Sequence, residues 1–189
     1  ILQLKKKSLI DCSNLSGSEL YRGWLGCSGL DDASETVAAI KRAKISDIEW
    51  IVVDHYSLEK TWEQWVSSNI PQNAKPKILV IDDLANRQHH ANLIMDQNYF
   101  GAITQHRYDQ LVAASCIKLL GPNYCILGSE YAQLRQLVPP RSNVKRILIY
   151  FGGIDNYGLN LRVINMLVET IPESIGIDVV LGVQSINIE

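Results

Sequence analysis

The sequence predicts an α/β fold built around a parallel, doubly wound sheet. Three observations indicate this class: short apolar runs rich in β-branched residues, a polar or glycine-containing loop directly after each run, and helix-like spacing in most of the intervals between them. Continuous apolar runs without alternation are typical of strands buried on both faces, as in a parallel sheet. With 189 residues, of which 47% are apolar, the chain is long enough to bury a sizeable core.

The apolar runs are predicted to be strands. In chain order they are Trp50–Val53, Ile78–Ile81, Leu93–Met95, Ile117–Leu120, Ile147–Phe151 and Val179–Leu181. Most intervals between the runs leave room for a crossover helix, as parallel neighbours require. The interval from 81 to 93 is the exception, because it is too short for a long helix.

Three helices are predicted, one before the first run and two in the intervals between runs. Asp32-Ala33-Ser34-Glu35 has the form of a capping box, and apolar residues on one helical face follow it. Residues 58–66, which contain Trp62 and Trp65, are predicted as the helix after Tyr56. Residues 159–170 are predicted as a further helix, since their apolar side chains recur at helical spacing.

Two adjacent prolines followed by polar residues lie between 137 and 145 and predict an inter-domain linker. We therefore expect a partial N-terminal Rossmann-like domain over residues 1–137, a linker over 138–145, and the start of a second domain over 146–189. The chain begins at Ile1 and ends at Glu189 just after an apolar run, so a piece of a longer protein is expected.

Composition argues against several functional classes. The 18 basic and 20 acidic side chains leave a formal charge of −2, which gives no electrostatic case for a nucleic-acid partner. No apolar stretch reaches the roughly 18–20 residues needed to cross a bilayer, and no signal peptide opens the chain. We expect a soluble cytoplasmic protein with no membrane partner.

The cysteines and histidines do not predict a metal centre. The 4 cysteines form no Cys-x-x-Cys pair, so reduced thiols are expected. His89 and His90 are adjacent, and both cannot easily turn to one metal ion from a regular element. No metal site is therefore expected.

Polar residues follow each predicted strand, where ligands bind in open parallel sheets. Asp54, His55 and Tyr56 offer a carboxylate, an imidazole and a phenol that could support proton transfer. Alternatively, Asp54 caps the next helix, His55 packs and Tyr56 anchors a loop. Spacing alone leaves both interpretations open.

Asp82 and Asp83 could form a metal-binding or general-base pair, but adjacent residues on a strand point to opposite faces. Capping by Asp83, with Arg87 as its counter-charge, is the favoured interpretation.

The later strand ends carry two glycine-containing loops. Gly121, Pro122 and Tyr124 follow the fourth run, while Gly152 and Gly153 follow the fifth and resemble a turn that holds a phosphate at a helix N-terminus. The complete G-x-G-x-x-G, P-loop and G-x-S-x-G patterns are absent, which removes support for a Rossmann dehydrogenase, a P-loop NTPase or an α/β-hydrolase.

Taken in order, these blocks resemble one family. The segment Val52–Tyr56 followed by Trp62-Glu63 is similar to the V-V-D-H-Y…W-E segment of bacterial UDP-sugar hydrolases of the pseudaminic acid pathway. The match continues in the same order through four further blocks, which are Ile81–Arg87, Leu93–Asn98, Leu119–Tyr124 and Phe151–Asp155. The resemblance spans roughly residues 24 to 182.

The resemblance implies a GT-B-like architecture, in which two Rossmann-like domains hold the nucleotide sugar between them. Residues 146–189 would then begin the C-terminal nucleotide-binding domain. Family members release UDP from a UDP-linked diacetamido-trideoxy sugar by attack of water at the anomeric carbon, so no metal and no cofactor is implied.

The resemblance also assigns candidate residues. Tyr56, His55 and Asp54 would be catalytic and lie near the sugar. The substrate-binding candidates come from both domains and comprise Asn98, Gly121, Pro122, Tyr124, Gly152, Gly153 and Asp155.

The resemblance does not extend to the family's N-terminal glycine-rich loop. That loop carries the histidine expected to act as the base, and nothing in residues 1–30 matches it. The role is not transferred to His55, and low or no activity is expected of these 189 residues alone. The alternatives are a GT-B glycosyltransferase of cell-surface glycan synthesis and a non-catalytic binding module, which could form a homodimer by exchange of its C-terminal segment.

Overall fold

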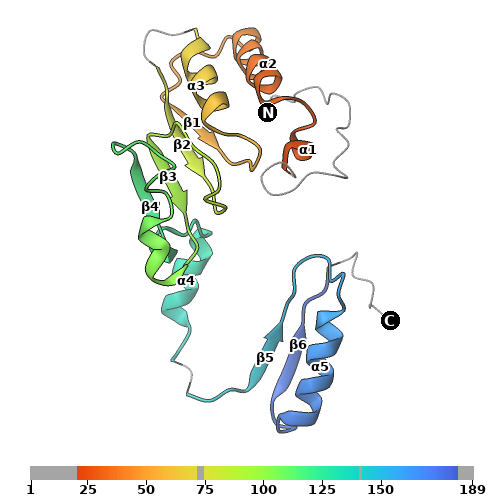
Figure 1. Cartoon of the computed structure of the whole chain (residues 1–189). Coiled ribbons are helices and arrows are strands. Elements are labelled where there is room, and N and C mark those ends of the chain that lie inside the picture. Colours follow the sequence, from red (N-terminus) through yellow and green to blue (C-terminus); the bar gives the residue numbers. More distant parts are fainter. Residues whose placement is uncertain (1–20, 72–74, 141, 183–189) are drawn as a thin grey trace. The chain divides into compact units, whose positions relative to one another are not determined.

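The first four strands form one parallel sheet, as predicted, in the order β1-β2-β3-β4 (Figure 1). A computed structural model describes residues 21–71, 75–140 and 142–182. The strands are β1 (Trp50–Val53), β2 (Lys77–Ile81), β3 (Leu93–Asp96) and β4 (Ile117–Leu120). This confirms an α/β protein with a Rossmann-like parallel sheet. The reversal of strand order that defines a doubly wound sheet does not occur among these four described strands.

One face of this sheet, which we call face A, carries the core of the first unit. Its residues alternate along each strand and include Val53, Val80, Ile94 and Leu120, all of them buried. They pack with Ala33, Val37, Trp62 and Val66 from two helices. Asp82 and Asp96 extend the same alternation to the carboxyl ends of β2 and β3.

The prediction that the strands are buried on both faces is wrong for the described part of the chain. The opposite face, face B, carries Trp50, Val52 and Ile117, which are 43%, 61% and 58% exposed. The strand order explains the difference. Crossovers between parallel strands are almost always right-handed, so connections that all step in the same direction cover the same face.

The helices of the first unit are α1 (Arg22–Leu25), α2 (Gly29–Arg42) and α3 (Lys60–Asn69). The predicted start of α2 at Asp32 is wrong by about one turn, because Ser28 is the N-cap and its hydroxyl accepts the Asp31 N–H at 3.1 Å. Asp32 instead accepts the indole N–H of Trp62 at 2.8 Å, which links α2 to α3. The interval between β2 and β3, predicted to be too short for a long helix, contains no helix.

Two short 3₁₀ helices follow β3 and β4 in the described part of the first unit. They are η2 (Gly101–His106), between β3 and β4, and η3 (Pro122–Tyr124), directly after β4. The chain divides into two compact units at Leu127 and Gly128.

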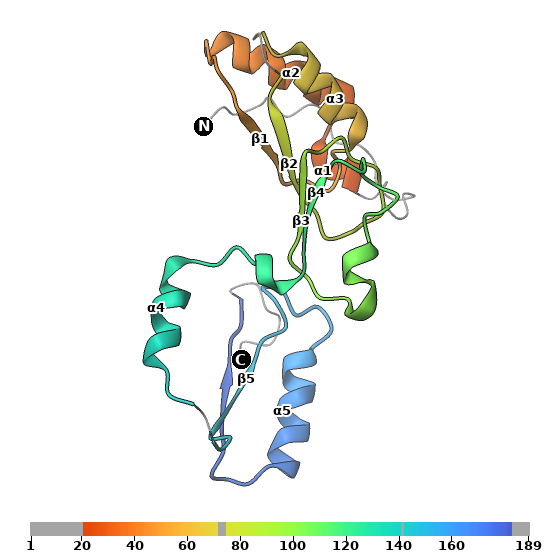
Figure 2. The same cartoon turned by 90° about the vertical axis from the view of Figure 1, so that its left-hand side faces the viewer.

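The second unit is a βαβ module preceded by a helix. It contains α4 (Ser129–Leu137), β5 (Arg146–Ile149), α5 (Leu159–Thr170) and β6 (Gly176–Val179). Figure 2 shows α5 lying alongside β5. The bounds of α5 match the prediction, but α4 was not predicted. Strand β6 begins earlier than the apolar run at 179–181, because Gly176 to Val179 pair in parallel with Arg146 to Ile149.

Among the helices that the structure describes, none combines the length and apolar character needed to cross a membrane.

Candidate functional site

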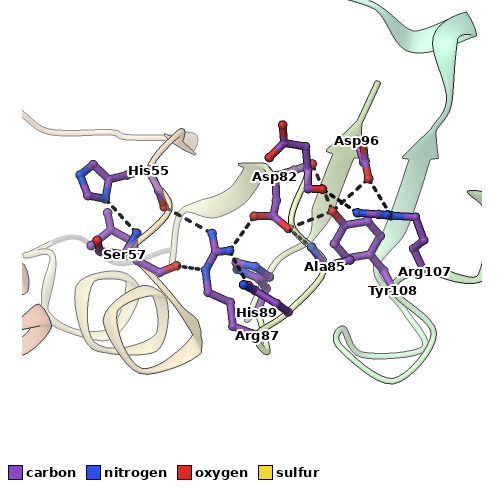
Figure 3. A network of polar contacts seen from close by, with 12 residues as sticks. His55, Ser57, Asp82, Ala85, Arg87, His89, Asp96, Arg107 and Tyr108 are labelled. Atoms are coloured by element: carbon purple, nitrogen blue, oxygen red, sulfur yellow. Dashed lines mark hydrogen bonds and ion pairs between the residues drawn. The ribbon is translucent and has the colours of Figure 1, made fainter. Parts of the chain in front are cut away.

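A buried polar network lies at the carboxyl ends of β2 and β3 on face A (Figure 3). Asp82, only 2% exposed, pairs with Arg87 through atoms Oδ1 and Nη1 at 2.7 Å. Its other oxygen accepts the Ala85 N–H at 2.9 Å. Burial alone would raise the pKa of Asp82, but Arg87, the Ala85 N–H and the Tyr108 hydroxyl together lower it below its ordinary value.

Tyr108 joins Asp82 to Asp96 within this network. Its fully buried hydroxyl lies 2.9 Å from Asp82 Oδ2 and 3.2 Å from Asp96 Oδ2. Burial first, and then the Asp82 charge, raise the pKa of Tyr108 far above its ordinary value. The phenol therefore stays protonated and acts as a donor. Arg107 supplies the counter-charge to Asp96, with Nε 3.1 Å from Oδ2.

The contacts of Asp82 correct the favoured interpretation of the Asp82-Asp83 pair. Asp82, rather than Asp83, holds the following loop and pairs with Arg87. Asp82 is buried on face A, whereas Asp83 is half-buried and acts on Tyr56. The Arg87 guanidinium also donates from Nε to the Leu58 carbonyl at 2.8 Å. The network thus ties the strand ends to the segment before α3.

The predicted Asp54-His55-Tyr56 group lies just beyond β1 at the same edge of the sheet. His55 Nδ1 accepts the Ser57 N–H at 3.0 Å, so the neutral ring carries its proton on Nε2. Burial lowers the pKa of His55, although the nearby Asp32 and Asp54 charges oppose this. His55 is therefore a neutral hydrogen-bond donor at pH 7.

Tyr56 and Asp54 differ in their surroundings. A hydrogen bond with the Asp83 carboxylate is the main cause that raises the pKa of the Tyr56 phenol, and burial adds to it. Asp54 is exposed. The alternative that Asp54 caps the next helix is wrong, because the N-cap of α3 is Glu59.

An aromatic cluster surrounds Tyr56 and was missed from the sequence. The ring centroids of Tyr21 and Trp24 lie 5.1 and 5.9 Å from that of Tyr56, and 5.0 Å from each other. The Ser57 hydroxyl donates to the Tyr21 carbonyl, which attaches this segment to the end of β1. The three-residue spacing of Tyr21 and Trp24 suits one face of a helical turn, which was the available signal.

The candidates after β3 and β4 lie further along the same edge. Asp96 organises this region, since its Oδ1 accepts the Asn98 N–H at 3.0 Å and its carbonyl accepts the Gly121 N–H at 2.7 Å. Gly121 has φ +96° and ψ 176°, a conformation that essentially only glycine adopts. It leads into Pro122 at the start of η3 and on to Tyr124, which is exposed.

The remaining candidates belong to the second unit. Asp155 is buried, and its carboxylate accepts the N–H groups of Leu159 and Asn160 at 2.9 and 2.8 Å. These bonds, the Asn160 N–H first, lower the pKa of Asp155. The first amides of α5 are therefore already bound to a carboxylate. Gly152, with φ +83°, and Gly153 each have open space where a Cβ would stand.

A second buried acid–base pair was also missed. Glu63 on α3 is 0% exposed and His89 is 3% exposed, and Glu63 Oε1 lies 2.7 Å from His89 Nδ1. Glu63 also accepts the His90 N–H. Within the described residues, no group of three or more His, Cys, Asp or Glu side chains is placed to hold a metal ion.

Comparison with known proteins identifies no relative. No protein-family model matches the chain, and a search of curated proteins finds no significant match. The fold and the strand-edge geometry define an α/β protein with a Rossmann-like sheet.

Proposed function

We propose that this chain is part of a GT-B-like nucleotide-sugar hydrolase, which releases UDP from a UDP-linked diacetamido-trideoxy sugar. The observation that carries the proposal is the group at the carboxyl end of β1. Tyr56, whose pKa the Asp83 carboxylate raises, and His55, whose Nδ1 accepts the Ser57 N–H, directly follow β1 at the edge where parallel sheets bind ligands. The ordered sequence blocks that resemble the hydrolase family support the same reading.

The proposed reaction is a substitution at the anomeric carbon. The oxygen of water forms a bond to that carbon, the bond from the carbon to the UDP oxygen breaks, and UDP leaves with the bonding electron pair. The proton of the attacking water passes to a base. His55 Nδ1 is occupied by the Ser57 N–H, so we assign His55 the role of a donor through Nε2 rather than that of the base.

Tyr56 would act by hydrogen bonding. Its phenol is protonated at neutral pH and donates its one O–H to Asp83, so its oxygen can accept a hydrogen bond from a hydroxyl or amide group of the sugar and orient the sugar. Asp83 fixes the direction of the phenol and is a positioning residue. In the second unit, the backbone of Gly152 and Gly153 would approach the diphosphate.

The test uses the complete gene product and measures UDP release from the UDP-linked sugar. We expect turnover that needs no acceptor, and a decrease of about 2- to 10-fold in kcat for Tyr56→Phe, because one neutral hydrogen bond contributes about 0.5–1.5 kcal/mol. Tyr131→Phe on α4 removes an exposed hydroxyl and should leave kcat unchanged.

The possible outcomes separate the alternatives. Release that depends on an added acceptor would identify a glycosyltransferase. A folded protein that neither binds UDP nor releases it would refute the proposal. Unchanged turnover in Tyr56→Phe would remove Tyr56 from the chemistry.

A further inference from the structure

Arg87 is a buried arginine that has no assigned part in the proposed reaction. Its side chain is only 6% exposed, although a charged group is costly to bury unless partners surround it. All three nitrogens of the guanidinium donate. Nη1 pairs with Asp82, Nε donates to the Leu58 carbonyl at 2.8 Å, and Nη2 donates to the His55 carbonyl at 3.4 Å (Figure 3). Arg87 therefore joins the end of β2 to the segment that follows β1.

The two carbonyls belong to one tight turn. The Leu58 N–H donates to the His55 carbonyl at 3.3 Å, which closes a turn with Tyr56 at its second position. Inside the turn, the Ser57 N–H donates to His55 Nδ1 at 3.0 Å. Arg87 thus donates to the first and the last carbonyl of the turn, and its rigid, planar guanidinium fixes both ends. Because the backbone of Tyr56 lies within the turn, the turn sets the direction of its side chain.

The same guanidinium is connected to the partner of Tyr56. Asp83, whose carboxylate raises the pKa of Tyr56, directly follows Asp82 in the chain. Asp82 is held by Arg87 at 2.7 Å. On the other side, Arg107 Nη2 donates to the Asp83 carbonyl at 2.6 Å. Both members of the contact between Tyr56 and Asp83 are therefore attached to the pair formed by Asp82 and Arg87.

We propose that Arg87 is a positioning residue of the candidate site, which sets the direction of the Tyr56 phenol by holding the turn of residues 55–58 against the end of β2. This inference rests on the proposed function for its effect on turnover. Arg87 acts through the geometry of its hydrogen bonds and not through its charge alone. Lysine at this position would keep the charge and the pairing with Asp82, but it has no planar set of donors for both carbonyls.

Arg87→Lys in the complete gene product separates the charge from the geometry. We expect NMR titration to show the pKa of the Tyr56 phenol falling toward its ordinary value of about 10, because the hydrogen bond to Asp83 weakens. Hydrogen exchange of the Ser57 N–H, which now donates within the turn, should become faster. An unchanged Tyr56 pKa together with unchanged Ser57 exchange in a folded Arg87→Lys protein overturns the inference.

The control is Arg42→Lys on α2. Arg42 is 63% exposed and pairs with Glu35 at 2.7 Å, so the same substitution is made in an ion pair of equal length that has no contact with the turn. Neither the Tyr56 pKa nor the Ser57 exchange rate should change in this variant.

Turnover provides a double-mutant cycle. Arg87→Lys should lower kcat about 2- to 10-fold and no further than Tyr56→Phe does, since it acts through the hydrogen bond of that phenol. In the Tyr56→Phe protein, Arg87→Lys should then have little additional effect, because the two substitutions remove the same interaction. Losses in kcat that multiply in the double variant overturn the inference.

A measurement on the wild-type protein covers the case in which Arg87→Lys does not fold. The Nε–H of Arg87 should exchange with solvent far more slowly than that of Arg42, and equal rates overturn the inference. The outcome for the proposed function is separate. Changes at Tyr56 and Ser57 in a protein that neither binds nor releases UDP support the hold of Arg87 on the turn and refute the proposed function.

Discussion

The Tyr108 hydroxyl is the group whose removal tests the buried network most directly. Tyr108→Phe deletes one oxygen that lies 2.9 Å from Asp82 Oδ2 and 3.2 Å from Asp96 Oδ2. Both carboxylates keep other partners, since Arg87 and the Ala85 N–H remain on Asp82. The loss is therefore one buried hydrogen bond to charged acceptors, and the free energy of unfolding should fall by about 2–3 kcal/mol.

Tryptophan fluorescence during urea unfolding measures this change in the first unit alone. All 4 tryptophans, at positions 24, 50, 62 and 65, belong to that unit. With a slope of about 1–2 kcal/mol per molar urea, the midpoint should fall by about 1–3 M. The control is Tyr99→Phe, which removes a hydroxyl from a side chain that is 73% exposed and should change stability by less than about 0.5 kcal/mol.

The pH dependence provides a second readout. Because the folded-state pKa of Asp82 is lowered, its contribution to stability is complete above the ordinary carboxyl pKa of about 3.9 and is lost as the pH falls through the folded-state value. Tyr108→Phe removes one of the groups that lower this pKa, so acid unfolding should begin at a higher pH. A midpoint shift below about 0.3 M urea, or no change in the acid transition, would refute the assigned role of Tyr108.

Three further predictions concern single residues. Gly121→Ala should destabilise the first unit by about 1–3 kcal/mol, because Gly121 has a positive φ that alanine rarely adopts. Gly29→Ala is the control, since a Cβ at Gly29 meets open space, and it should be neutral or stabilising in the same urea assay. Equal effects of the two substitutions would show that backbone strain is not the cause. NMR titration should give His55 a pKa below 6.5, and the neutral ring should carry its proton on Nε2. The contribution of His55 to stability is then present above pH 6.5 and is lost as the pH falls through the folded-state pKa. A measured pKa above 6.5 contradicts this prediction. The Asp155 carboxylate accepts the first two backbone N–H groups of α5, so Asp155→Ala should speed hydrogen exchange at these two amides. Unchanged protection of the two amides would show that Asp155 is not needed to cap the helix.

The sheet could be predicted from the sequence because buried strands produce continuous apolar runs. The exposure of face B could not be predicted from the sequence. Trp50 and Val52 on that face are apolar, so the apolar run of the strand is the same whether one face of the sheet is covered or both. The start of α2 was ambiguous for a local reason. Ser28 and Asp32 are both good N-cap residues, and the contact of Asp32 with Trp62, 30 positions away, is not visible in a local pattern.

The site was predicted in part. That Tyr56 and Asp83 lie at one edge follows from the parallel order of β1 and β2, but their hydrogen bond depends on loop conformations that spacing does not specify. Tyr108 lies 26 residues from Asp82 and Glu63 lies 26 from His89, so neither partnership has a sequence period. The catalytic and substrate-binding roles stay predictions.

The strand order β1-β2-β3-β4 also bears on how the first unit forms. Every pairing among these four described strands joins strands that are consecutive along the chain, so none of the four has to wait for a distant segment before it can pair with its neighbour. Sheets with such local pairing close shorter loops and fold faster than sheets in which remote strands meet. During synthesis, each strand can add to the edge left by the previous one, and the unit can assemble in the order in which it is made.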